Sequence, residues 1–358
     1  MSQADPEDAA PSPPARSPAT LEQVAKAAGV SLATASRVLS GGARKPREEL
    51  RQRVLAAVRS LNYSPNANAQ AVARGLSDIV GLIVHDISDP YFASIASGVM
   101  READRHGLIV TVTDTRRDPG REIAYVAALR RQRARALLLA GTRTTDSRLT
   151  RLLGDELESY CSFGGRVALI SQHVYGLDTI QVQNQQGGAD LAEALHRIGY
   201  RRFALLPGPP TLRTPRDRTT GFRRALAAHG IKIEPGDIAH SDFSRDGGYE
   251  AMDGLLTRGT RAQCVFAAND VMAVGAMAAV RARGLSVPDD MAVAGFDDIV
   301  TLRDIMPSLT TVHIPLEELG GRAVELVLDP SSGSPRTHRI RGKVVLRDST
   351  PPLGDAAG

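Results

Sequence analysis

Apolar residues follow a helical period in three short stretches near the start of the chain. Residues 21–28, 32–39 and 47–61 place alanine, valine and leucine at intervals of three and four, which predicts one apolar face for each helix. Thr20 and Ser31 precede the first two helices, where a side-chain oxygen accepts from a free backbone N–H. Gly29 ends the first helix, because glycine adopts the left-handed conformation without a Cβ clash. The pattern predicts an all-α, three-helix helix-turn-helix unit over residues 19–63.

The pattern changes at Ile79 to an alternation of strands and helices. Continuous apolar runs, typical of strands covered on both faces, occur at 79–84, 108–112, 136–140, 167–170, 203–206, 264–268 and 291–295. Helical patterns separate these runs at 90–106, 119–132, 184–198, 215–229, 245–258 and 268–283. Such alternation predicts parallel sheets covered by helices. Since about 270 residues exceed one typical domain, we expect a two-lobed α/β unit over residues 78–352.

Charge separates these two parts of the chain. The net charge is +4, but residues 19–78 alone hold nine Lys and Arg against four Asp and Glu. Positive charge gathered in one small segment is typical of a protein that binds a polyanion. Residues 1–18, rich in Pro, Ala, Ser and acids, and residues 353–358 are predicted to be tails without fixed structure.

The predicted second helix exposes a face suited to the major groove of DNA. Arg37 can donate two parallel hydrogen bonds to guanine, and Leu32 and Ala33 can contact a thymine methyl group. Hydroxyl side chains suited to phosphate contacts stand at Ser31, Thr34 and Ser36. The alternative interpretation is a small helical module that docks on another protein.

Two stretches of this helical region closely resemble the LacI/GalR family of transcriptional repressors. They are Thr20–Gly42 and the following "LNYSPNANAQAVARG", and the resemblance continues through "ANDVMAVGA", "GFDD" and "SLTTVHIPLEELG" to Pro352. It implies further DNA contacts from Thr20, Asn62, Tyr63 and Asn66, and a hinge helix over residues 64–77. In the family, paired hinge helices wedge a Leu into the minor groove, and Val72 holds that position here, with a shorter side chain. From the residues alone, this segment is equally a linker.

The resemblance also implies an effector-binding domain similar to periplasmic sugar-binding proteins. By position, Arg218, Asn269 and Asp297 match the polar effector clamp, and the apolar walls match Tyr91, Phe92 and Phe243. The chain departs from the family at three positions near the expected cleft. Ser171 replaces a frequent Asp, while His85 and His173 replace frequent Pro residues. We therefore hypothesise an anionic or otherwise atypical effector, against the alternative that both imidazoles are structural or solvated.

The sequence argues against catalysis and against a bound cofactor or metal. It contains no nucleophile elbow, HExxH motif, paired-carboxylate motif, P-loop or dinucleotide fingerprint. Asp297 and Asp298 are adjacent carboxylates without further ordered ligands, and Asp298 is equally a helix cap. Cys161 and Cys264 form neither a metal spacing nor a disulfide framework, which suits a reducing cytoplasm.

These observations predict a cytoplasmic regulator that binds a pseudo-palindromic DNA operator as a homodimer and responds to a sugar or related metabolite. Its final residues, "RDSTPPLGDAAG", carry no heptads of the kind that build family tetramers, so a dimer is preferred. No signal-peptide pattern and no apolar run of about 18 residues is visible, and no membrane partner is expected. The alternative is a solute-binding protein or small-molecule receptor without a DNA role.

Overall fold

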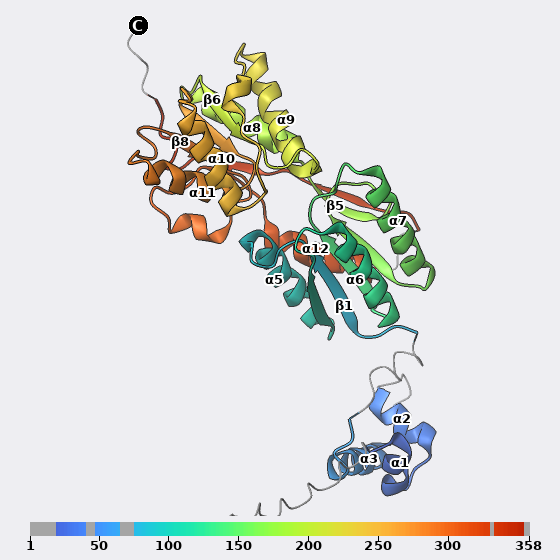
Figure 1. The fold of residues 1–358 in the computed structure, drawn as a ribbon. Coiled ribbons are helices and arrows are strands. Elements are labelled where there is room, and N and C mark those ends of the chain that lie inside the picture. Colours follow the sequence, from blue (N-terminus) through green and yellow to red (C-terminus); the bar gives the residue numbers. More distant parts are fainter. Residues whose placement is uncertain (1–18, 41–46, 65–74, 330–332, 354–358) are drawn as a thin grey trace, which may run out of the picture. The chain divides into compact units, whose positions relative to one another are not determined.

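The computed structural model describes residues 19–40, 47–64, 75–329 and 333–353. The chain divides into two compact units, residues 1–74 and residues 75–358 (Figure 1). The predicted tail at 1–18 lies outside the described residues, as do most of the predicted hinge helix and all of the predicted tail at 353–358 except Leu353, whose N donates to the Ile198 carbonyl at 2.8 Å. Asn66 and Val72 belong to that part of the hinge helix, so both remain sequence predictions.

The first unit contains three described helices around one small core. These are α1 (Leu21–Ala28), α2 (Leu32–Ser40) and α3 (Glu48–Ser60). Thr20 caps α1 reciprocally with Gln23: Gln23 N donates to Thr20 Oγ1 at 3.3 Å, and Thr20 N donates to Gln23 Oε1 at 2.9 Å. One residue from each helix, Val24, Ala35 and Val54, is fully buried at the centre. The predicted helix-turn-helix fold is confirmed.

The second unit begins with a lobe built on a parallel sheet. Its six described strands run in the order β10-β5-β4-β3-β1-β2. Their bounds are β1 (Ile79–Val84), β2 (Ile109–Asp114), β3 (Ala136–Ala140), β4 (Arg166–Ile170), β5 (Asp178–Val182) and β10 (Thr337–Ile340). Four helices cover the sheet: α5 (Pro90–Arg105), α6 (Pro119–Arg131), α7 (Ser147–Ser162) and α12 (Leu316–Leu328). Successive residues of β3 face opposite ways, with Leu138 in the core beneath α5 and α12 and Leu139 beneath α6 and α7.

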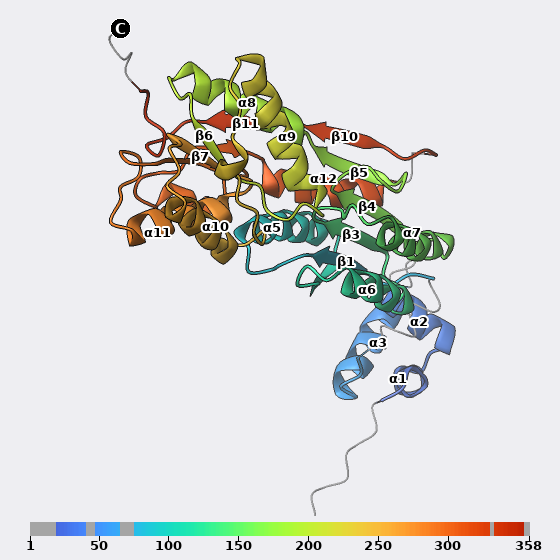
Figure 2. The same cartoon turned by 45° about the horizontal axis from the view of Figure 1, so that its top comes forward.

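The second lobe repeats the same layering on a smaller sheet. Strands β6 (Phe203–Leu206), β7 (Cys264–Ala267) and β8 (Ala292–Ala294) are parallel, in that order. Helices α8 (Asn184–Arg197) and α9 (Arg213–Ala228) cover one face, and α10 (Arg245–Thr257) and α11 (Asp270–Ala282) cover the other (Figure 2). An antiparallel pair, β9 (Thr311–His313) and β11 (Lys343–Val345), completes this lobe, with short 3-10 turns at Pro235–Asp237 and Val300–Arg303.

Close helix packing in this lobe depends on glycine. A Cβ built on Gly188 of α8 would lie 2.0 Å from the carbonyl oxygen of Arg218 in α9, so only glycine allows this approach. The result is that Arg218 is held against the start of α8.

All seven predicted strands are present, within two residues of their expected ends. The sequence analysis missed α7, α12 and the strands β5, β9, β10 and β11. The chain passes between the lobes after β5, before α12 and between β10 and β11. Among the described residues, no helix is both long and apolar enough to span a bilayer.

Candidate DNA-binding face and effector cavity

Helix α2 separates a buried side from an exposed one, as its pattern predicts. Ala35 is fully buried, while the side chains of Ala33, Ser36 and Arg37 are exposed and Leu32 is 46% exposed. About half of the Leu32 side chain therefore remains accessible for a contact with a partner. The guanidinium of Arg37 and the methyl groups of Leu32 and Ala33 therefore belong to one accessible helix face.

The hydroxyls at the start of α2 form its cap. Thr34 N donates to Ser31 Oγ at 3.2 Å, and the two side-chain oxygens are 2.9 Å apart. The hydroxyls of Ser31 and Thr34 therefore lie at the N-terminus of α2, where the partial positive charge of the helix favours a phosphate. Thr20 is also exposed, although its oxygen is engaged in the α1 cap.

Two predicted DNA contacts follow α3 and differ in exposure. Asn62 is exposed, with a left-handed φ of 48°, which asparagine tolerates better than most residues. Tyr63 is half-buried and packs against the core of the three helices. Its ring therefore also stabilises the helical unit, a role that the sequence analysis did not assign.

The effector cavity lies within the second unit, where the carboxyl ends of strands from both lobes meet. The space within it is about 520 Å³ when the open solvent at its mouth is counted. The first lobe contributes His85, Tyr91, Phe92 and Ser171 from the predicted set, and the second contributes Arg218, Phe243, Asn269 and Asp297. Eight of the nine predicted effector residues thus line one cavity.

Arg218 and Asp297 form a buried ion pair at the floor of this cavity. Arg218 Nη2 and Nη1 lie 2.6 Å and 3.2 Å from the two Asp297 carboxylate oxygens, so the contact is bidentate. Arg218 also donates to Asn184 Oδ1 and to the Ala268 carbonyl, both at 2.8 Å. Its guanidinium lies 3.9 Å from the centre of the Phe296 ring. These contacts fix the guanidinium before any ligand enters.

Burial changes the proton affinity of the carboxylates around this pair. Loss of hydration raises the pKa of Asp297 to about 6, although the Arg218 charge opposes the rise. Burial and the nearby negative charge of Asp297 raise the pKa of Asp270 to about 8. Asp270 accepts from Thr311 Oγ1 at 2.7 Å and from Ile299 N at 3.1 Å, so it fixes the loop that carries Asp297.

Asn269 caps α11 and lines the cavity at the same time. Its Oδ1 accepts from Met272 N at 3.0 Å, which leaves the amide nitrogen to donate to a ligand. This local role explains why a planar amide rather than an apolar residue follows β7. Asn269 therefore adds a fixed donor beside the Arg218–Asp297 pair.

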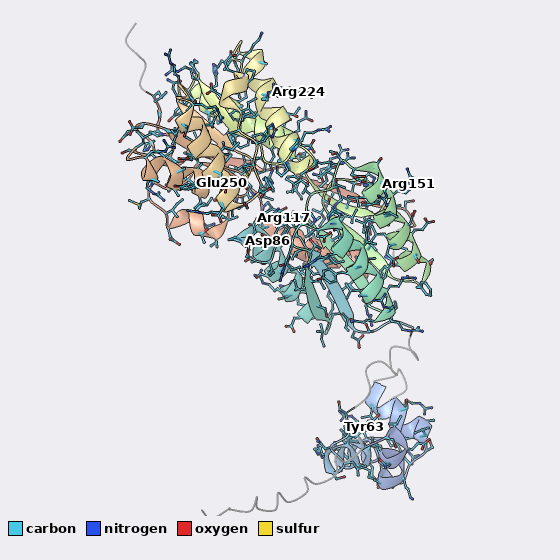
Figure 3. All side chains as sticks on the ribbon, viewed as in Figure 1. Tyr63, Asp86, Arg117, Arg151, Arg224 and Glu250 are labelled. Atoms are coloured by element: carbon cyan, nitrogen blue, oxygen red, sulfur yellow. The ribbon has the colours of Figure 1, made fainter. Side chains whose placement is uncertain are left out.

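The sequence analysis missed a second charged pair on the opposite wall. Asp89 caps α5 by accepting from Tyr91 N at 3.0 Å, and burial raises the pKa of its carboxyl. Arg117 Nη2 lies 3.7 Å from a carboxylate oxygen of Asp89 and of Asp86. Figure 3 shows Arg117 and Asp86 close to each other in the first lobe. The cap could have been predicted from "DPYF", since Asp before Pro at a helix start is an N-cap signal. The pairing of Asp89 with Arg117 could not, because only the fold brings the two residues together.

Gln172 and Asn184 also line the cavity without having been predicted. Gln172 Oε1 accepts from Arg143 N at 2.9 Å, and Gln172 Nε2 donates to Thr214 Oγ1 at 2.7 Å. The second of these bonds joins the loop after β4 to the start of α9, and hence one lobe to the other. A polar residue directly after a predicted strand was the signal that could have found Gln172.

The aromatic residues form the apolar walls, as the resemblance implies. Tyr91 and Phe92 meet edge to face, with ring centres 5.0 Å apart and planes at 88°. Phe243 comes from the second lobe, and the Arg117 guanidinium lies 5.7 Å from the centre of its ring. Aromatic faces beside polar donors can cover the C–H surface of a ring-shaped ligand.

The two histidines, both predicted near the cleft, lie in different places. His173 does not line the cavity: it is exposed, and its Nδ1 lies 3.3 Å from Thr179 Oγ1 and 3.2 Å from Thr337 Oγ1. Its placement in the cleft was wrong, because the chain turns outward toward β10 after Ser171 and Gln172. His85 does line the cavity, but burial lowers its pKa despite Glu122 beside it, so the imidazole is neutral near pH 7.

Ser171 and Asp298 have structural partners. Arg143 Nε donates to Ser171 Oγ at 3.1 Å, so a buried guanidinium stands behind the position where the family often has Asp. Asp298 neither caps a helix nor lines the cavity: it pairs with Arg347 at 2.6 Å and with His313 at 2.9 Å.

Comparison with known proteins accounts for both units. A family model described as bacterial regulatory proteins, lacI family, matches residues 20–66, and one described as a periplasmic binding protein-like domain matches residues 192–350. The HTH-type transcriptional regulator DegA of Bacillus subtilis is 31% identical over 340 residues, which are 93% of this chain and 98% of DegA.

Solved structures extend this likeness to the fold. The Lac repressor dimer bound to operator and the anti-inducer ONPF matches with a TM-score of 0.81 and 27% identity, over 94% of this chain and 100% of that one. The complex of the transcriptional regulator CelR with cellobiose matches with a TM-score of 0.68 and 28% identity, over 92% of this chain and 99% of that one. The fold class, the regulatory function and the exclusion of an enzyme are confirmed. This chain belongs to the LacI family of bacterial transcriptional regulators.

Proposed function

We propose that this regulator binds a pseudo-palindromic operator as a homodimer in the cytoplasm, and that a neutral polyhydroxylated effector in the cavity of the second unit sets its affinity for DNA. The observation that carries this proposal is the bidentate Arg218–Asp297 pair, buried at the floor of a cavity with aromatic walls. Planar charged groups of this kind engage adjacent hydroxyls in pairs.

Charge balance in the cavity favours a neutral ligand over the anionic one hypothesised from sequence. Arg218 faces Asp297 and Arg117 faces Asp89, so the two positive and two negative charges cancel. His85 adds no charge, and His173 lies elsewhere. An anionic effector would find no excess positive charge here, whereas hydroxyl groups would find both donors and acceptors.

The exposed face of α2 supports recognition of DNA bases. Arg37, Leu32 and Ala33 share that face, while Ser31 and Thr34 stand at its N-terminus for phosphate. A two-fold symmetric dimer would present two such helices to two half-sites. The similar Lac repressor is a dimer bound to operator in its solved structure, which supports this proposal.

Both lobes line the cavity, which gives the effector a means of control. A ligand that contacts residues of both lobes favours the arrangement in which they close on it. By linkage, operator affinity then changes by the same factor as effector affinity. A corepressor stabilises the lobe arrangement that binds DNA tightly, and an inducer stabilises the arrangement that binds DNA weakly.

The DNA part is tested by titrating the full chain against labelled genomic fragments and then against the selected operator. Arg37→Ala should relax base preference at one position of each half-site, worth about 1–3 kcal/mol of discrimination. Arg59→Ala, which removes an exposed charge of α3, is the matched control and should weaken all sequences alike. Unchanged base preference in Arg37→Ala would contradict the assigned readout.

The effector part is tested by calorimetry with neutral and acidic sugars. We expect neutral sugars to bind and to change operator affinity, and Asn269→Leu to weaken that binding while the protein remains folded. A preference for sugar acids over their neutral parents would refute the charge-balance argument.

A further inference from the structure

A surface hollow lies on the first lobe, beside Gly75, where the chain enters the second unit. Its charged lining residues are Arg130, Arg131 and Arg133, and no Asp or Glu of the described residues lines it. The effector cavity differs, because each of its two arginines faces a carboxylate. We call the new surface the entry hollow. Its lining carries only positive charge, which is typical of a surface that receives an anion.

Two arginines near the entry hollow already have carboxylate partners. Arg130 Nε lies 3.0 Å from Glu156 Oε1, and the Arg130 guanidinium lies 5.6 Å from the centre of the Phe163 ring. Arg135 Nη2 lies 2.6 Å from Asp78 Oδ1. Contacts within the unit therefore account for these two charges.

Arg131 and Arg133 are not accounted for in this way. Both residues are exposed, and no carboxylate in the described part of the chain forms an ion pair with either. Arg131 stands in the last turn of α6, where a positive charge also favours the helix dipole. Arg133 has a left-handed φ of 53°, which Gly or Asn adopts more easily than Arg. The backbone therefore does not explain an arginine at position 133, whereas a partner for its guanidinium does.

The turn that carries Arg133 is attached to the first residues of the second unit. Its carbonyl accepts from Ser77 N at 2.8 Å and from Ser77 Oγ at 3.1 Å, and Arg133 Nη1 donates to the Gly75 carbonyl at 3.4 Å. Residues 65–74 connect this point to the helical unit, and a chain of about ten residues spans at most about 35 Å. So short a connection holds a second binding event at a millimolar effective concentration, where weak contacts add to affinity.

We propose that Arg131 and Arg133 contact phosphates of the operator backbone while the helix-turn-helix unit reads the bases. This rests on the proposed function, because the face of α2 must first hold the operator. Guanidinium groups bind phosphate oxygens in pairs, and such contacts carry no base preference of their own. DNA is the anion that fits the entry hollow, since the chain arrives there directly from the DNA-binding unit. An acidic protein would meet the same charge without the short connection.

The test measures the operator affinity of the full-length protein by fluorescence anisotropy at about 50 to 200 mM KCl. Each phosphate contact contributes about 0.9 to the slope of log Kd against log salt concentration. Arg131→Gln combined with Arg133→Gln removes two contacts per protomer, so the slope for a dimer should fall by about 2–4. The ratio of the affinities for operator and for a scrambled duplex should stay within about twofold, because phosphate contacts do not read bases.

Two further variants separate DNA contact from other effects of these substitutions. Arg223→Gln combined with Arg224→Gln removes the same charge from exposed positions of α9, in the second lobe (Figure 3), and should leave the slope unchanged. Arg131→Lys combined with Arg133→Lys keeps both charges and should retain the slope.

Three results would overturn this inference and leave the proposed function standing. They are an unchanged slope in the glutamine variant of the entry hollow, an equal fall in the α9 variant, and a slope that the lysine variant loses as well. If the unaltered protein shows no salt-dependent affinity for any duplex, both this inference and the proposed function fail.

Discussion

Replacing Asp297 by asparagine tests the role of the buried ion pair in both stability and binding. The side chains of Asp297 and Arg218 are 5% and 3% exposed, and their closest contact is 2.6 Å. The variant keeps the shape of the side chain and one acceptor oxygen. Asn also tolerates the positive φ of 124° at this position about as well as Asp, so the substitution mainly removes a charge.

The size of the expected loss of stability follows from the burial of the pair. Leaving the Arg218 charge buried without its partner destabilises a protein by about 3–5 kcal/mol. The pKa of Asp297, raised to about 6, shows that its own buried charge costs stability near pH 7.5, so removing that charge offsets part of the loss and we expect a net loss of about 1–3 kcal/mol. For a unit of this size, 1 kcal/mol lowers Tm by about 2 °C, so we expect Tm to fall by about 2–6 °C. The control Asp253→Asn breaks a similarly short pair with Arg283, 2.7 Å long but about 40% exposed, and should leave Tm almost unchanged because solvent screens exposed pairs.

The assay is thermal and urea denaturation of the full chain at about pH 7.5, followed by circular dichroism, with effector affinity measured on the same samples. We expect Asp297→Asn to lose both stability and effector binding, and Asp253→Asn to lose neither. Equal losses in the two variants would show that burial does not set the strength of the Arg218–Asp297 pair.

Three further predictions concern other parts of the molecule. Burial raises the pKa of Asp270 from its ordinary 3.8 to about 8, so the folded state keeps a proton that the unfolded state loses, and stability falls as pH rises from about 4 to about 8. Asp270→Asn should remove a loss of up to about 1.4 kcal/mol per pH unit, and equal pH slopes in urea titrations would contradict it. Gly188→Ala places a Cβ 2.0 Å from the Arg218 carbonyl oxygen and should cost about 1–3 kcal/mol in the same assay, whereas Gly254→Ala, facing only a flexible side-chain end, should be neutral or slightly stabilising. Thr20→Ala removes the α1 cap and should destabilise the helical unit alone by about 1 kcal/mol; no change in its unfolding would refute the role of the cap.

The elements that sequence predicted are those whose pattern is fixed by burial. Strand β1 reads as a continuous apolar run because both faces are covered, and five of its six residues are buried. Strand β5, "DTIQV", mixes polar and apolar residues, and its outer neighbour β10 comes about 150 residues later, so no local pattern indicates the pair. Helix α7 could have been predicted from the sequence, since its buried Leu153, Leu157 and Tyr160 follow helical spacing.

The same distinction applies to the cavity. Arg218, Asn269 and Asp297 were found because their local motifs resemble the family, and the fold brings them together. Arg117 was missed because its pairing with Asp89 joins two loops that only the sheet places side by side. His173 was misplaced for the converse reason, since the strand that it faces, β10, was not predicted.

The polar clamp and the signalling contacts belong to different lobes. Arg218 is held by Asn184, by the Ala268 carbonyl and by Asp297, all within the second lobe, so the clamp is preformed whatever the first lobe does. Asp89 and Tyr91 reach the cavity from the first lobe. A ligand shifts an equilibrium only through contacts that differ between its two states. Under the proposed function, we therefore expect contacts with the second lobe to contribute mainly to effector affinity, and contacts with the first lobe to contribute mainly to the coupling with DNA.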